Sequence, residues 1–332
     1  MVTALPQLSG RRALQVAVAA PVALALVVWG LLSVRGEPSP SGRVTLATGV
    51  PSGVYARYGE LLKQDLAQDM PDVDLRLARS EGSIDNLRQL VSGRAEFTIA
   101  TADAVATYRA RRERGADRLR ACARLYDDYM QLVVPKKSGI RSARQLRRLR
   151  VGVGSDRSGV QLITKRLLKA AGLDFDKDIE PVRVGIDRMP AMLERGKLDA
   201  FFWSGGLPTT AVQHLARQFP IRLVQLGDLS EALHAQGEPT RHYRAAVMPA
   251  DAYPTVQNGQ AVKTIAVANL LVTTDREDAA MTFGMTRTVI NSRDWIGRQV
   301  HAAQRVDLRT AVFTDPLALH RGARRYYLSV KP

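Results

Sequence analysis

The chain contains very little cysteine, since Cys122 is the only one among its 332 residues. A lone cysteine excludes an intramolecular disulfide and any zinc site built from several cysteines. Cys122 lies in an apolar stretch, RACARLY, so we expect it to be a small buried core residue. The five histidines are scattered along the sequence and show no H-E-x-x-H spacing. We therefore expect neither a metal ion nor any other cofactor.

Motifs of common catalytic and nucleotide-binding sites are also missing. There is no G-x-S-x-G sequence, which would indicate a nucleophilic serine. The first glycine-rich turn lacks the lysine of a Walker loop, and its glycines, Gly49 and Gly53, do not fit G-x-G-x-x-G. The carboxylate pair Asp127-Asp128 follows a strand-like run, and we interpret it as part of a surface turn. An enzyme is accordingly the less favoured class of protein.

One long apolar run is present near the N-terminus. Residues 13–34 form a stretch of 22 residues without a charge. About 20 apolar residues span a bilayer, whereas the core of a signal peptide has about 7–15. Arg11 and Arg12 precede the run, which favours a cytoplasmic segment 1–12 and export of the remainder. We favour a retained membrane anchor over a cleaved signal; cleavage would give a secreted or periplasmic protein.

Residues 35–43 follow as a Pro/Ser/Gly-rich linker, so the folded part is predicted to begin at Arg43 or Val44. The net charge of +16 is concentrated in two arginine clusters, at residues 109–124 and 141–150. Such clusters bind phosphates in nucleic-acid-binding proteins, but they also occur on solvated helix faces. No nucleic-acid-binding motif accompanies them, so we favour the second interpretation and expect no nucleic-acid partner.

From Val44 onward, short apolar runs alternate with helical segments, which is typical of α/β architecture. The pattern predicts strands over 44–48, 73–78, 96–100, 119–126, 130–134, 150–154, 181–184, 199–204 and 221–226. It predicts helices over 54–68, 84–92, 102–113, 159–171, 187–195 and 208–217. Residues 263–274 predict two further strands or one long one, before a largely helical tail. We expect two lobes: residues 44–132 with 246–332, and residues 133–245.

Several Gly/Ser turns open directly into predicted helices. Residues 48–53 (TGVPSG) and 152–159 (GVGSDRSG) each follow a strand, and EGSIDNL (81–87) repeats the arrangement. Ligands of open α/β sheets bind at the carboxyl ends of strands, and helix N-termini favour anions, so these turns predict an anion site. Each turn also has a simpler explanation as a tight connection or an N-cap, and Trp203 fits the cleft and the core equally well.

Taken together and in order, several stretches resemble the TAXI family of solute-binding proteins of TRAP transporters. They are ATGVPSGVYARYGELL, EGSIDNLRQL, RACARLYDDYMQLVV, GIRSARQLRRLRVGVGSDRSGV, LDAFFWSGGLPTTAVQHLA and MPADAYPTVQNGQAVKTIAVANLLV, with PLALHRGARRYY at the end. The resemblance extends from Val44 to Tyr327. It implies a type II periplasmic-binding-protein fold, in which two hinged α/β lobes close on a small acidic solute. That solute, such as glutamate, glutamine or a related dicarboxylate, would pass to the membrane subunits of a TRAP permease.

The resemblance also implies a set of ligand-binding residues by motif position. They are Gly49, Ser52, Gly53 and Tyr55 in the first loop, Ser83 and Asn86 in the second, Asp103 in the third, Ser158 and Gly159 in the fourth, and Trp203, Gly205 and Gly206 in the fifth. The sequence departs from the family pattern at Val50-Pro51, Thr101 and Arg157. An inward Arg157 would grip a carboxylate with two hydrogen bonds, whereas an outward one would be a solvated charge.

A protein with this fold and a membrane anchor has one further interpretation. It could act as a solute sensor that signals to a partner protein instead of supplying a permease. The sequence does not distinguish these two functions, because both use the same binding cleft.

Overall fold

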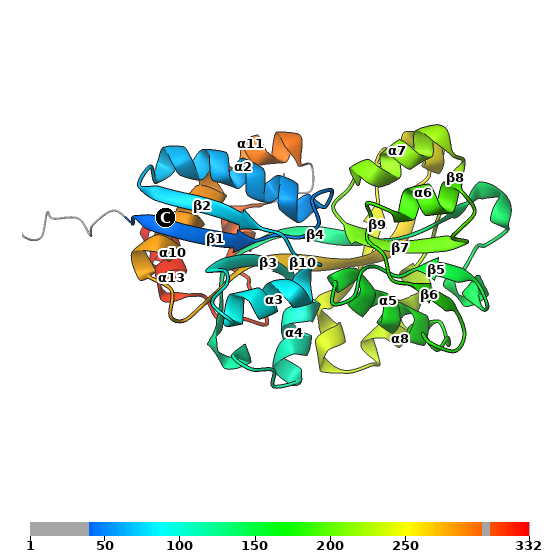
Figure 1. Cartoon of the computed structure of the whole chain (residues 1–332), viewed down its shortest axis with the longest axis horizontal. Coiled ribbons are helices and arrows are strands. Elements are labelled where there is room, and N and C mark those ends of the chain that lie inside the picture. The colour runs from blue at the N-terminus through cyan, green and yellow to red at the C-terminus, as the bar shows by residue number, and fades with distance from the viewer. Residues whose placement is uncertain (1–39, 301–305, 332) are drawn as a thin grey trace, which may run out of the picture. The chain divides into compact units, whose positions relative to one another are not determined.

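The computed structural model describes residues 40–300 and 306–331 (Figure 1). Residues 40–332 form one compact unit. The predicted anchor at residues 13–34 lies outside the described residues. Within the described ranges, none of the helices combines the length and the apolar character needed to cross a membrane.

A single mixed sheet of ten strands organises the described residues. Its order is β2(Val73–Ala78), β1(Gly42–Ala47), β3(Phe97–Thr101), β10(Val262–Thr274), β4(Leu119–Pro135), β7(Ala200–Gly205), β5(Arg150–Gly152) and β6(Glu180–Val182). In addition, β8(Ile221–Val224) pairs with β4 and β9(Tyr243–Met248) pairs with β10. The pairs β1–β2, β1–β3, β5–β6 and β5–β7 are parallel, and the long strands β4 and β10 are antiparallel to each other and to their neighbours. The two long strands therefore run from one parallel group to the other (Figure 1).

The helices begin close to where the sequence predicts them. The predicted ones are α2(Val54–Asp69), α3(Ser83–Val91), α4(Ala102–Ala110), α5(Gly159–Ala170), α6(Met189–Glu194) and α7(Thr210–Gln218). Short helices α8(Ser230–His234) and α9(Pro254–Gln257) precede β10, and the tail contains α10(Ala279–Asn291), α11(Arg293–Gln299), α12(Leu308–Ala311) and α13(Arg321–Ser329). Turns of 3-10 helix lie at Ala116–Arg118, Lys136–Ser138, Ala143–Leu146, Gly227–Leu229 and Glu238–His242.

Strand β4 corrects one sequence prediction. Residues 119–126 and 130–134 were expected to be two strands separated by a turn at Asp127-Asp128, but one strand of 17 residues runs through both. It continues because both carboxylates have partners. Asp127 forms ion pairs with Arg124 and Arg244, and Asp128 is buried against Asn269. Residues 262–274 likewise form one long strand, which was one of the two alternatives.

Three apolar clusters form the core. One packs α2 and α10 on the β1–β3 end of the sheet, through residues such as Leu62, Phe97 and Met285. Another lies at the β7 end and includes Phe201 and Val212. The largest cluster contains residues from both ends, which explains why the ends form one compact unit. The predicted lobe boundaries remain a prediction.

Cys122 is fully buried in the core, as predicted. Burial raises the pKa of its thiol far above the usual range. Because the thiolate is the reactive form, Cys122 is chemically inert in the folded protein. It acts as a small apolar side chain.

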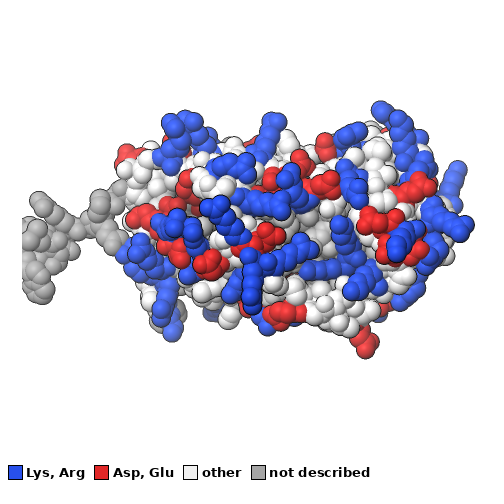
Figure 2. Space-filling view, turned by 60° about the horizontal axis from the view of Figure 1, so that its bottom comes forward, with Lys and Arg blue, Asp and Glu red and all other residues white. Residues whose placement is uncertain are grey.

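Several arginines of the two clusters are paired with aspartates. Figure 2 shows Lys and Arg side chains interspersed with Asp and Glu on the face that it displays. Five arginines of the clusters form ion pairs with aspartates: Arg120 with Asp275, Arg124 with Asp127, Arg144 with Asp228, Arg147 with Asp178 and Arg150 with Asp199. This pairing favours the interpretation of these clusters as solvated surface charge.

Candidate functional site

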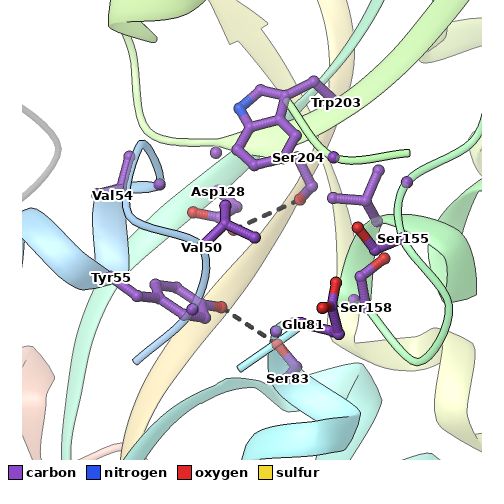
Figure 3. A pocket seen from close by; sticks show the side chains of 18 of the residues that line it. Val50, Val54, Tyr55, Glu81, Ser83, Asp128, Ser155, Ser158, Trp203 and Ser204 are labelled. Atoms are coloured by element: carbon purple, nitrogen blue, oxygen red, sulfur yellow. Dashed lines mark hydrogen bonds between the residues drawn. The ribbon is translucent and has the colours of Figure 1, made fainter. Parts of the chain in front are cut away.

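A cavity of about 60 Å³ lies between the two ends of the sheet (Figure 3). A single water needs roughly 10–15 Å³ on the same measure, so the cavity has room for several waters or one small solute. One wall comes from the β1–β3 end, with Gly49, Val50, Gly53, Val54, Tyr55, Glu81, Gly82, Ser83 and Thr101. The other comes from β4 and the β7 end, with Asp128, Gly154, Ser155, Ser158, Gly159, Val160, Gly185, Trp203, Ser204 and Gly205.

Four helices begin at residues that line this cavity. The N-cap residues of α2, α3 and α4 are Gly53, Gly82 and Thr101, and none of them makes a side-chain capping hydrogen bond. The N-cap of α5 is Ser158, whose hydroxyl accepts from the Gln161 N–H at 3.0 Å. Helix N-termini carry partial positive charge and unpaired N–H groups. The cavity is therefore suited to a negatively charged group.

The N-termini of α3 and α5 contact each other directly. The Asp85 N–H donates to the Arg157 carbonyl at 3.3 Å. A methyl group added at Gly159 would lie 3.0 Å from the Ser83 hydroxyl oxygen, and one at Gly82 would lie 3.4 Å from the Ser158 Cα. Two positive helix ends in contact repel each other unless an anion lies beside them. This arrangement is the strongest electrostatic indication of an anionic ligand.

A chain of polar side chains crosses the cavity from α3 to β7. Ser83 Oγ lies 3.3 Å from the Tyr55 hydroxyl, which donates to the side-chain oxygen of Asn269. The Asn269 amide nitrogen donates to Asp128 at 2.8 Å, and the Ser204 hydroxyl donates to the other Asp128 oxygen at 3.5 Å. Burial is the main cause that raises the pKa of Asp128 to about 7; the two hydrogen bonds oppose this rise, and the nearby carboxylates of Asp127 and Asp103 add to it.

Trp203 contributes an indole ring to the same cavity (Figure 3). The residue is 8% exposed, and its ring nitrogen has no hydrogen-bond partner among the described residues. A Cβ at Gly205 would lie 2.5 Å from that nitrogen, so only glycine leaves space for the ring here. Buried donors are normally satisfied. The Trp203 indole N–H is therefore an unsatisfied buried donor in a residue that lines the cavity.

Eight of the predicted ligand-binding residues line the cavity: Gly49, Gly53, Tyr55, Ser83, Ser158, Gly159, Trp203 and Gly205. The other five do not. Ser52 and Arg157 are exposed, so Arg157 has the outward position of the two considered. The Gly206 carbonyl accepts from the Thr209 hydroxyl at 2.9 Å.

Asn86 and Asp103 are also outside the cavity, and both have structural partners. The Asn86 amide donates to the backbone carbonyls of Thr48 and Ile99, which ties α3 to the sheet. Asp103 accepts from the Tyr243 hydroxyl at 2.6 Å and from Arg166 at 3.3 Å. Their contribution to ligand binding remains a prediction.

Sequence reasoning missed Asp128, because it was interpreted as a surface residue. Two adjacent carboxylates within a largely apolar run, LYDDYMQLVV, were the available signal. Glu81, Gly154, Ser155 and Ser204 were also missed, although each lies in or beside a stretch that the motifs had marked. Among the described residues, no group of three His, Cys, Asp or Glu side chains could hold a metal ion.

Comparison with known proteins places the chain in a family. The NMT1-like family matches residues 46–328. Among solved structures, a protein from Bordetella bronchiseptica RB50 is 17% identical with a TM-score of 0.51, over 87% of this chain and 90% of that one. A putative L-cystine ABC transporter from Listeria monocytogenes is 13% identical with a TM-score of 0.49, over 80% and 98%. The periplasmic aliphatic sulphonate binding protein of Escherichia coli is 15% identical with a TM-score of 0.47, over 89% and 84%. The predicted α/β fold is confirmed by the mixed sheet and its helices.

Proposed function

Since this chain belongs to the NMT1-like family, we propose that it is an extracytoplasmic solute-binding receptor. The observation that carries the proposal is the cavity between the two ends of the sheet, at which four helices begin. Small-molecule sites are concave, partly apolar and supplied with a few polar groups, as this one is. The two lobes predicted from the sequence would close on the solute around this cavity.

We further propose that the solute is a small carboxylate such as glutamate, glutamine or a related dicarboxylate. The uncapped N-termini of α2, α3 and α4 support this, because backbone N–H groups and helix dipoles bind carboxylates without a cationic side chain. The sequence resemblance to the TAXI family supports delivery to a TRAP-type permease. The apolar run at residues 13–34 supports a position at the outer side of the cell membrane.

A binding function is preferred to catalysis because of what surrounds two serines of the cavity, Ser83 and Ser158. The Ser83 hydroxyl contacts Tyr55 and the Thr101 N–H, and the Ser158 hydroxyl caps α5. Nucleophilic serines need an adjacent general base. In the described part of the chain, no histidine lines the cavity.

The test is thermal unfolding of the protein with a panel of amino acids, dicarboxylates and 2-oxo acids. A solute at a hundred times its dissociation constant stabilises the folded state by about 2.7 kcal/mol. For a unit of this size, we expect the unfolding midpoint to rise by roughly 5–10 °C with one group of acids. If no acid on the panel shifts the midpoint, the carboxylate proposal is wrong.

Replacing Gly159 by valine is expected to weaken binding of the shifting acid about ten- to hundredfold. The new Cβ would lie 3.0 Å from the Ser83 oxygen and 3.5 Å from the Thr101 hydroxyl, so it would force the two walls of the cavity apart. Overpacking of this kind costs about 1–3 kcal/mol. The measurement is calorimetric titration. Lys169→Val, a substitution at an exposed position near the other end of α5, is the control and should bind like the wild type. If Gly159→Val and Lys169→Val bind the acid with equal affinity, the acid binds outside this cavity.

A further inference from the structure

Asp128 is a buried carboxyl group without a cationic partner. It is 4% exposed and lines the cavity. Its neighbour Asp127 forms ion pairs with Arg124 and Arg244, whereas no Lys, Arg or His in the described residues forms one with Asp128. Buried carboxylates are usually paired with a positive charge, because an isolated one is expensive to bury.

The hydrogen bonds around Asp128 all have it as the acceptor. The Asn269 amide donates to one oxygen at 2.8 Å, and the Ser204 hydroxyl donates to the other at 3.5 Å. The first contact is of normal length and the second is at the long limit of a hydrogen bond. The oxygen facing Ser204 is therefore weakly satisfied. Both neighbours donate hydrogen bonds, which suits an ionised Asp128. Its oxygen facing Ser204 can accept a hydrogen bond from a further donor.

The two sides of the cavity consequently differ in charge. Figure 3 shows Asp128 beside Trp203 and Ser204 on one side, with Ser83 and Ser158 on the other. The Ser83 and Ser158 side carries the N-termini of α3 and α5, with their partial positive charge, and also the exposed residue Glu81. A ligand with a carboxylate at one end and a protonated amine at the other would complement both sides.

We infer that Asp128 binds the protonated amino group of the solute, so that the receptor selects amino acids over acids of the same skeleton that lack the amine. This inference rests on the proposed function and narrows it. A simple dicarboxylate would place a second negative charge next to Asp128, and no Lys or Arg side chain of the described residues lines the cavity to offset it. An ammonium group supplies both the missing donor and the missing charge.

The charged and titratable groups around Asp128 do not substitute for that amine. Those that interact with it are Asp127 on β4, Asp103 on α4, Tyr55 on α2 and Tyr126 on β4, while Glu81 lines the same cavity. All are acidic groups. Arg124 on β4 and Arg244 on β9 are engaged by Asp127.

Calorimetric titration of the full chain at pH 8 with matched pairs of acids tests the inference. The pairs are L-glutamate with glutarate, L-glutamine with glutaramate, and L-leucine with 4-methylpentanoate. In the pair that binds, we expect the wild type to bind the amino acid about a hundredfold more tightly than its deaminated partner. This ratio is typical of the affinity lost when one member of a buried charge pair is removed. Asp128→Asn should reduce that ratio to below tenfold. Asp127→Asn, which removes the adjacent carboxylate, should leave it within threefold of wild type.

A second measurement uses only the wild-type protein, in case Asp128→Asn folds poorly. An ammonium group that binds Asp128 must displace any proton from its carboxyl group. Calorimetric titration in two buffers of different ionisation enthalpy measures the protons released on binding. We expect release at pH 6 and none at pH 9. The inference is wrong if deaminated acids bind as tightly as amino acids, or if Asp128→Asn keeps the wild-type ratio of the two affinities. Either result would leave the receptor function intact. If no acid in any pair binds, the proposed carboxylate ligand is wrong and the inference fails with it.

Discussion

Without ligand at pH 8, Asp128→Asn is expected to raise the free energy of unfolding by about 4 kcal/mol. Burial raises the pKa of Asp128 to about 7, and the ordinary value is near 3.8. Each pKa unit of that difference lowers the free energy of unfolding of the wild type by about 1.4 kcal/mol once the carboxyl group is ionised. Asparagine has nearly the same size and can keep the contacts with Asn269 and Ser204, but it carries no charge.

The pH dependence of this gain has a defined sign. Below about pH 4 the carboxyl group is protonated in both the folded and the unfolded protein, so the variant and wild type should have nearly equal stability. Between about pH 4 and pH 7 the unfolded state loses the proton first, so the wild type loses stability as the pH rises. Above pH 7 the difference reaches its full size and stays constant.

Urea unfolding of both proteins from pH 4 to pH 8.5 measures this difference directly. Taking the difference between the two proteins removes the contribution of all other titrating groups. Asp127→Asn is the matched control. Its free energy of unfolding should not rise relative to wild type as the pH increases, because Asp127 is paired with two arginines. A difference that does not change with pH would show that Asp128 has an ordinary pKa in the folded protein.

Arg166→Met is expected to destabilise the protein by about 3–5 kcal/mol. Arg166 on α5 donates to Asp103 on α4 at 3.3 Å, and their side chains are only 14% and 2% exposed. It also donates to Tyr243 and to Thr107, each at 2.7 Å. Removing the arginine leaves the Asp103 carboxylate buried without its counter-charge, which is the costly way to break a buried ion pair.

The double variant Asp103→Asn with Arg166→Met separates this cause from simple loss of packing. Neutralising Asp103 removes the uncompensated charge, so the double variant should recover most of the lost stability. The single variant should unfold roughly 6–20 °C below wild type. A loss below 1 kcal/mol, the range of exposed ion pairs, would mean that this contact does not join α4 to α5 in solution.

Local patterns were sufficient to predict many individual elements. The alternation in VDLRLA predicts a strand over residues 73–78, and β2 has those bounds because Val73 and Leu75 are buried while Asp74 and Arg76 are exposed. The Gly/Ser turn GVGSDRSG predicts a helix from Gly159, and α5 begins there with Ser158 as its cap. In both cases the pattern that predicts the element lies within a few residues of the chain.

The missed features depend on partners that are distant in the sequence. Asp128 is accommodated inside a strand because Asn269, 141 residues away, donates to it. Asp103 is engaged by Tyr243, 140 residues away, so its position in the family's third loop did not bring it into the cavity. Strand β9 shows little alternation of buried and exposed residues, since Arg244, Ala245 and Val247 are all exposed. It is defined by its pairing with β10. Sequence patterns do not contain these pairings.

A crystal structure of the protein grown with the acid that most raises its unfolding midpoint would test the central claim most directly. We expect electron density for that acid in the cavity, with its carboxylate beside Ser83 and Ser158 at the N-termini of α3 and α5. An unoccupied cavity, with the acid bound anywhere else on the protein, would contradict it.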